Sequence, residues 1–180
     1  MKTFTFTLIT GLTLLTSTLS AQNQMYAGAG LGMDFIEDAD NNGILGELSI
    51  GTVFDNNFGL EGKFSTSISD SEESQNGIKE KDSITTLSVF LTYTHAIDQQ
   101  LSLTPKIGFS KTTVDAKRSD NFGGTASHDD SDTGISFGLD VKYKYNPTTY
   151  IYAGYTLFDP KLFNQKQDLR TFSIGVQKKF

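Results

Sequence analysis

Apolar and polar residues alternate along most of this chain, and the last ten residues show the pattern most clearly. One parity of this segment is apolar: Phe172, Ile174, Val176 and Phe180. The other parity is small, polar or charged: Thr171, Ser173, Gly175, Gln177 and Lys179. Side chains along a β-strand point to opposite faces in turn, so this period of two predicts a strand with one apolar and one polar face.

The same alternation recurs in seven earlier segments. We predict strands over residues 26–33, 44–54, 58–68, 83–95, 101–112, 135–145 and 149–158. Phe90 has the parity of the polar face, and we interpret it as a side chain that fills space inside the fold. Pro105 has no backbone N–H, so we expect a bulge or a local break in strand pairing there.

The segments between the predicted strands alternate between short and long. Short turns are expected at 55–57, 96–100 and 146–148, and long polar connections at 34–43, 69–82, 113–132 and 159–168. An even number of strands lets the first and the last pair antiparallel, so that no edge is left open. Strands of about ten residues suit a tilted membrane crossing. The predicted fold is therefore all-β, an eight-stranded antiparallel up-and-down transmembrane β-barrel. A soluble lipocalin-like barrel is the alternative, because periodicity does not say which face is outside.

The amino-terminal segment has the pattern of an export signal. Lys2 precedes an uncharged, threonine-rich apolar run over residues 4–19, and small residues follow at 17–21. We predict a signal peptide over residues 1–21 and a barrel domain over 22–180, the alternative being a short membrane anchor. The chain has no cysteine and a net charge of −6. An acidic chain is a poor partner for nucleic acid, and no cofactor is expected.

Six charged residues have the parity of the predicted interior: Glu47, Glu61, Asp140, Lys63, Lys106 and Lys142. The interior of an eight-stranded barrel is only wide enough for its own side chains, and unpaired charge there would be costly. We therefore predict a neutralised network of ion pairs rather than a general diffusion pore. A narrow ion path is the alternative interpretation.

The long connections carry most of the acidic residues, including Asp34, Glu37, Asp38, Asp40, Asp70, Glu72, Glu73, Asp129, Asp130 and Asp132. Loops on a rigid framework commonly carry recognition, so an interaction with a host or envelope surface is one interpretation. A variable, solvated surface is the other. Asp38, Asp40 and Asn42 resemble the opening of a calcium loop, but Ser49 stands where the closing glutamate is needed. An Asn-Gly turn explains the same residues.

Two histidines raise the possibility of catalysis. His128 lies in the run Ser-His-Asp-Asp, which contains residue types of hydrolytic sites, and some small barrels modify lipid A with His and Ser. We place His128 in a polar loop and His95 at the opposite end of the barrel. Neither position suits a site fixed on the wall at the outer leaflet, so no enzyme is predicted. The alternative is a lipid-A-modifying enzyme.

Four motifs, in this order and spacing, resemble the small outer-membrane barrels of the OmpA-like, OmpX-like and opacity-protein-like families. They are the glycine-rich segment 26–32, the turn and strand over 54–62 with Glu61, the segment 105–108, and the closing segment 175–180. The resemblance implies the cell outer membrane, a monomer in contact with lipid and lipopolysaccharide, and a role in adhesion or envelope integrity.

The resemblance also implies that Phe172, Ile174, Val176 and Phe180 form the signal read by the barrel-insertion machinery. Lys178 stands where an apolar residue is usual, and a lysine at a membrane rim can extend its ammonium toward water. The chain has no tryptophan. The aromatic belt near the short turns would then come from Tyr26, Phe54, Phe58, Tyr93, Tyr143, Tyr145 and Phe180.

We predict that the mature protein fractionates with the outer membrane, requires detergent, and shifts in gel mobility when boiled. A band of apolar side chains facing lipid does not stay monodisperse in water. A water-soluble protein without a boiling shift would contradict the prediction, and would indicate an inward apolar face and a small apolar ligand.

Overall fold

The computed structural model describes residues 24–36, 43–68, 71–75, 78–119, 125–158, 161–162, 165–166 and 169–180. The predicted signal peptide, residues 1–21, lies outside the described residues, as do most of the predicted connections 34–43 and 159–168. No helix among the described residues is long and apolar enough to cross a membrane.

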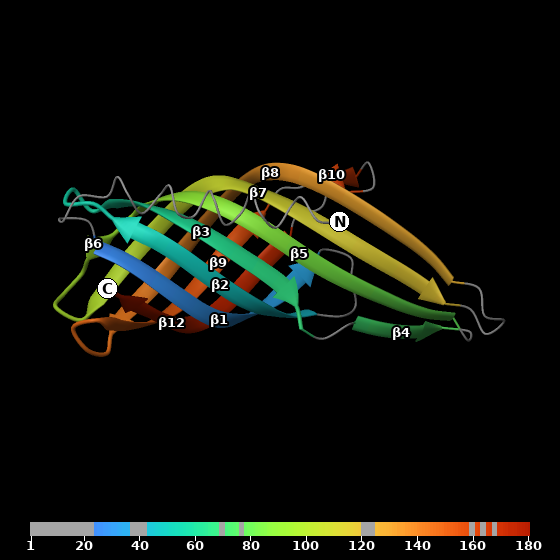
Figure 1. Cartoon of the computed structure of the whole chain (residues 1–180), viewed down its shortest axis with the longest axis horizontal. Coiled ribbons are helices and arrows are strands. Elements are labelled where there is room, and N and C mark those ends of the chain that lie inside the picture. The colour runs from blue at the N-terminus through green and yellow to red at the C-terminus, as the bar shows by residue number, and fades with distance from the viewer. Residues whose placement is uncertain are drawn as a thin grey trace.

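Eight antiparallel strands close into a barrel, and Figure 1 shows them tilted around a common axis. They are β1 (Gln24–Ile36), β2 (Gly43–Val53), β3 (Phe58–Ser67), β5 (Ile78–Tyr93), β7 (Leu101–Ser119), β8 (Thr125–Lys144), β9 (Thr149–Phe158) and β12 (Leu169–Lys179). Each pairs with its neighbours along the chain, and β1 pairs with β12 to close the ring. The predicted eight-stranded up-and-down barrel is confirmed.

Four short strands accompany the barrel. They are β4 (Ser71–Gln75), which pairs with β5, β6 (His95–Ala96), which pairs with β7, and the hairpin of β10 (Lys161–Leu162) and β11 (Gln165–Lys166). The break between β5 and β6 lies opposite Pro105. Pairing along β7 stops at Thr92↔Lys106 and resumes at His95↔Leu103 in the same register. Because proline donates no hydrogen bond, the predicted break occurs without a bulge.

The two faces of the barrel wall have the predicted polarity. Leu31, Val89 and Ile174 are 56 %, 60 % and 57 % exposed, whereas Thr171 and Ser173 on the opposite parity are 2 % and 1 % exposed. The apolar face is therefore the outer face, and the interior is polar. The soluble alternative, with its apolar face inside, is wrong, because a soluble monomer rarely exposes a continuous apolar band.

Each short turn is held by an Asn or Asp side chain. In the first turn Asn57 takes a left-handed conformation (φ 66°), which Asn tolerates better than most residues. In the second, Asp98 Oδ1 accepts the backbone N–H of Gln100 and of Leu101, each at 2.7 Å. These two donors hold the pKa of the Asp98 carboxyl below its usual value. In the third, Asn146 Oδ1 accepts the N–H of Thr149 at 2.8 Å. The three predicted turns are confirmed.

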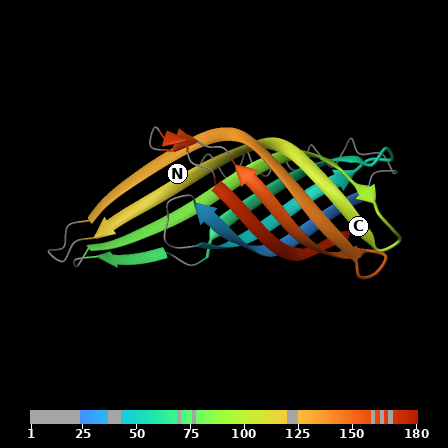
Figure 2. The same cartoon turned by 180° about the vertical axis from the view of Figure 1, so that it is seen from behind.

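Two of the predicted long connections are wrong over most of their length. Residues 78–82 belong to β5, 113–119 to β7 and 125–132 to β8. With β4 these residues form a sheet that extends beyond the barrel wall, as Figure 2 shows from behind. We call it the projecting sheet: residues 71–75, 78–83, 115–119 and 125–135. The apolar alternation is absent from these residues although their backbone pairing continues, so the strands predicted from that alternation are too short.

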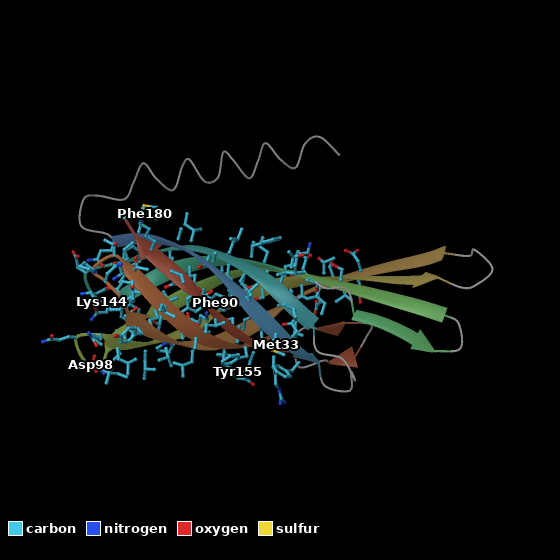
Figure 3. The ribbon with its side chains drawn as sticks, turned by 90° about the horizontal axis from the view of Figure 1, so that it is seen from below. Met33, Phe90, Asp98, Lys144, Tyr155 and Phe180 are labelled. Atoms are coloured by element: carbon cyan, nitrogen blue, oxygen red, sulfur yellow. The ribbon has the colours of Figure 1, made fainter. Side chains whose placement is uncertain are left out.

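The other end of the barrel, which we call the short-turn end, carries the three turns and the carboxyl terminus. Asp98, Lys144 and Phe180 lie there, and Phe90 lies inside the barrel (Figure 3). Phe58, Tyr93, Tyr143, Tyr145 and Phe180 are exposed around it, and the rings of Phe58 and Tyr93 are 5.0 Å apart. The expectation that Tyr26 belongs to this aromatic belt is wrong, because Tyr26 is 3 % exposed and points inward.

Some inward glycines are required by the close approach of neighbouring strands. A Cβ on Gly108 would overlap the carbonyl oxygen of Val89 and come within 2.9 Å of the Phe90 Cα, and both are backbone atoms that cannot rotate away. Gly62 faces outward, and the nearest atom to a Cβ there is 3.8 Å away. The interior face therefore restricts side-chain size where the outer face does not.

We predict that Gly108→Ala lowers the free energy of unfolding by about 1–3 kcal/mol, because adjacent strands must shift apart. The same substitution at Gly62 is expected to change it by less than about 0.5 kcal/mol. Urea unfolding in detergent micelles, followed by circular dichroism, measures both. Equal effects at the two positions would contradict the predicted backbone overlap.

Candidate functional site

All six charged residues singled out from the sequence lie inside the barrel, each at most 5 % exposed. Lys63 Nζ contacts Glu47 Oε1 at 2.7 Å. Lys106 lies between two carboxylates, with Nζ 2.8 Å from Asp140 Oδ1 and 3.5 Å from Glu61 Oε1. Two of these contacts join adjacent strands, and the contact between Lys106 and Glu61 joins β7 to β3 across β5, so the ion pairs connect different parts of the wall.

Aromatic side chains complete the network near the short-turn end. The Tyr26 hydroxyl donates to Glu61 Oε2 at 2.8 Å, and Lys142 Nζ lies 5.1 Å from the centre of the Tyr26 ring. Lys106 Nζ lies 5.2 Å from the centre of the Phe90 ring, and Phe90 is fully buried. Both rings therefore fill interior space and also lie within the range of cation–π attraction.

A ladder of hydroxyls lines the wall formed by β5, β7 and β8. Ser136 donates to Ser110 at 2.6 Å, and Ser110 donates to Ser88 at 2.7 Å. The hydroxyl oxygens of Thr86 and Thr112 are 3.1 Å apart. Because a hydroxyl both donates and accepts, such a row satisfies buried polar atoms without adding charge.

The structure places a fourth carboxylate inside. Asp34, expected in an outward loop, lies in β1, is 1 % exposed and accepts a hydrogen bond from the Thr171 hydroxyl. The expectation of an exposed Asp34 is therefore wrong. A signal was available, because Asp34 has the same parity as the inward residues Gly30 and Gly32. The predicted strand ends at Met33, one residue before Asp34.

An apolar cluster closes the interior at the end opposite the short turns. Ile84, Phe158 and Leu169 are at most 8 % exposed and pack together, with Val114 against them. The register places Leu169 opposite Phe158 and Ile84 opposite Val114. Side chains thus occupy the interior from Tyr26 at one end to this cluster at the other, an arrangement suited to a closed barrel.

The remaining candidate residues lie outside this network. Asp38, Asp40 and Asn42, the calcium candidates, are outside the described residues. Among the described residues there is no group of three or more His, Cys, Asp or Glu that could hold a metal ion. His128 is part of β8 and pairs with Ala116, so its assignment to a loop is wrong. His95 is exposed in β6. Phe172, Ile174, Val176 and Phe180 face outward on or beside β12, and their role in insertion stays a prediction.

A family model for outer membrane protein β-barrel domains matches residues 4–180. The match spans all the strands described above. The chain belongs to this outer-membrane β-barrel family. Membership places it in the bacterial outer membrane and assigns the apolar outer face to lipid.

Solved structures share the fold. Ail, the attachment invasion locus protein of Yersinia pestis, in complex with the heparin analogue sucrose octasulfate, aligns with a TM-score of 0.66 at 22 % identity, covering 88 % of this chain and 99 % of Ail. Neisserial surface protein A aligns with a TM-score of 0.63 at 14 % identity, covering 89 % of this chain and 98 % of that protein. The N-terminal β-barrel domain of Pseudomonas aeruginosa OprF aligns with a TM-score of 0.56 at 13 % identity, covering 87 % of this chain and 98 % of that domain. No curated protein matches the sequence significantly.

We predict that Lys106→Met destabilises this outer-membrane barrel by about 3–5 kcal/mol, because it leaves Glu61 and Asp140 buried without their shared cation. The matched control is Lys111→Met on the exposed face of the same strand, expected to change stability by less than about 0.5 kcal/mol. Urea unfolding in micelles measures both. A loss equal to that of the control would show that Lys106 is not needed to compensate the carboxylates.

Proposed function

We propose that this protein is a closed outer-membrane barrel that presents the projecting sheet for surface interaction, in adhesion or envelope integrity, and that it is neither a general diffusion pore nor an enzyme. The observation that carries the proposal is the continuation of β5, β7 and β8 beyond the wall as a paired sheet. Backbone pairing outside the membrane gives a rigid surface, which suits recognition better than a flexible loop.

The barrel interior supports the exclusion of a pore. Its buried ion pairs and the cluster of Ile84, Phe158 and Leu169 occupy the space that a solute would need. Export by a cleaved signal peptide over residues 1–21 would place both ends of the mature chain in the periplasm. The short-turn end then faces the periplasm, and the projecting sheet faces outward.

The charge of the projecting sheet indicates the class of partner. By sequence it contains eight acidic residues and four Lys or Arg. Ail was solved with a sulfated heparin analogue, but an acidic surface disfavours such a polyanion. We therefore propose a basic protein surface as the partner. Electrostatic complementarity of this kind raises association rates and lowers affinity at high salt.

Two strand edges offer a way to hold an extended segment of such a partner. β4 pairs with β5 alone among the described strands, and β8 pairs with β9 only over residues 136–144. An exposed strand edge carries backbone donors and acceptors that can pair with an added strand. Acidic residues at Glu72 and Glu73 of β4 would favour a basic segment there.

The proposed role does not use catalysis. His95 lies at the short-turn end, away from the outer leaflet in the proposed orientation. His128 lies in the projecting sheet, beyond the part of β8 that pairs with β9. A lipid-A-modifying site would need its residues on the wall at the level of the lipid headgroups, and neither backbone position meets that requirement.

We predict that cells displaying the full protein adhere to surfaces coated with a basic protein at least roughly tenfold better than cells displaying a trimmed variant, a difference of ~1.4 kcal/mol if adhesion follows affinity. The trimmed variant replaces residues 71–82 and 115–129 with short hairpin turns and keeps the barrel. A boiling shift of the trimmed protein checks that it folds.

A control variant carries Asp55→Asn, which changes an exposed acid at the short-turn end. It is expected to adhere like the parent protein. Equal adherence of the full and trimmed proteins would contradict the surface role. Steady ion conductance of the purified barrel in planar bilayers would contradict the closed interior.

A further inference from the structure

We propose that the barrel interior binds one alkali cation, Na⁺ or K⁺, beside Asp34. Asp34 is 1 % exposed and its Oδ1 accepts the hydroxyl proton of Thr171. Its Oδ2 has no hydrogen-bond partner among the described residues. An ionised carboxylate in this position is costly unless a positive charge lies next to it.

No interior lysine forms an ion pair with Asp34 among the described residues. Lys63 pairs with Glu47, and Lys106 is shared between Glu61 and Asp140. Lys142 lies over Tyr26 near the short-turn end, whereas Asp34 is close to the opposite end of β1. Four buried carboxylates therefore meet three buried ammonium groups, and Asp34 is the carboxylate without an ion-pair partner among the described residues.

Uncharged oxygens lie on the strands beside Asp34. Thr156 pairs with Thr171, which in turn pairs with Asp34, so the three side chains form a row across β9, β12 and β1 on the inner face. Ser173 is the next inward residue of β12. The hydroxyl oxygens of Thr156 and Ser173 are buried, at 0 % and 1 % exposure, and neither has a hydrogen-bond partner among the described residues. The Asp34 carboxylate and the two hydroxyls thus lie on three consecutive strands of the inner face, each with an oxygen that has no hydrogen-bond partner among the described residues. A cation bound at Asp34 Oδ2 would supply the missing partner there.

The apolar cluster separates this region from the outside. Phe158 lies two residues after Thr156 on β9, and Leu169 lies two residues before Thr171 on β12. Both therefore lie directly beyond the row of oxygens. Asp34 is 1 % exposed, so its carboxylate has little contact with bulk water. A bound cation therefore stabilises the folded state more here than it would at an open surface.

The donor set fits an alkali cation better than a divalent one. All the candidate ligands are oxygens, which suits hard cations. Calcium takes six to eight oxygen ligands and is usually held by several carboxylates, whereas Asp34 supplies one uncompensated charge. A single monovalent ion balances the four carboxylates and three lysines.

The test is the salt dependence of unfolding in uncharged detergent micelles at constant ionic strength. Sodium chloride and potassium chloride are each compared with tetramethylammonium chloride, whose cation is too large for a buried site. The unfolding midpoint of the parent protein is expected to rise with the logarithm of Na⁺ or K⁺ concentration, because the ion binds only the folded state. Asp34→Asn, which keeps the shape and a carbonyl acceptor for Thr171, is expected to abolish this rise.

Asp55→Asn is the matched control and should keep the full ion response. If Asp34→Asn does not fold, the double variant Thr156→Val with Ser173→Ala leaves the carboxylate in place. It is expected to need at least a tenfold higher ion concentration for the same rise in the unfolding midpoint. Broadening of the sodium NMR line by the parent protein, reversed by K⁺, gives a direct readout. Equal midpoints in the three salts would overturn the proposal. So would a response that survives Asp34→Asn, or a midpoint that depends on pH alone, which would indicate that Asp34 holds a proton.

Discussion

The closed ladder of backbone hydrogen bonds, completed where β1 meets β12, is the constraint on which the rest of the structure depends. Lipid offers no partner for a backbone N–H or C=O, so every strand within the membrane must pair on both sides. Closure with eight strands fixes a narrow interior. It also assigns one parity of each strand to lipid and the other to that interior, which is why Leu31 and Thr171 have opposite exposures.

The narrow interior has consequences for every charged residue that faces it. An ammonium group such as that of Lys106 is retained because it lies between two carboxylates, and Tyr26 and Phe90 fill the volume that ion pairs leave. The apolar cluster around Phe158 then closes one end. A barrel filled in this way supports the proposal of a closed interior with its function on the outer surfaces.

Outside the membrane the same strands have a different pattern of residues. Beyond the wall, β5, β7 and β8 continue to pair, and by sequence polar residues occupy both parities of these segments. In the proposed role, the framework that spans the membrane also supports an acidic surface for recognition. Membrane anchoring and recognition would then be properties of one continuous set of strands.

Much of the fold was predictable because its determinants are local. Alternation defined the eight membrane strands and their outer faces, and Asn and Asp at residues 57, 98 and 146 marked the turns. The length of the projecting sheet was not predictable from apolar periodicity, since that signal exists only where one face is dry. Asp34 and Tyr26 have the parity of the interior, but their burial depends on how far β1 extends and on closure with β12.

By itself, the sequence determined which residues face lipid and which face inward, because side-chain direction along a strand follows from parity. Only the tertiary structure decided which inward residues meet. The stagger between neighbouring strands places Lys106 between Glu61 and Asp140, and it leaves Asp34 beside Thr171 with no ion-paired lysine among the described residues. Contacts across a barrel depend on register and tilt around the whole ring, and these are set jointly by all the strands rather than by any one segment.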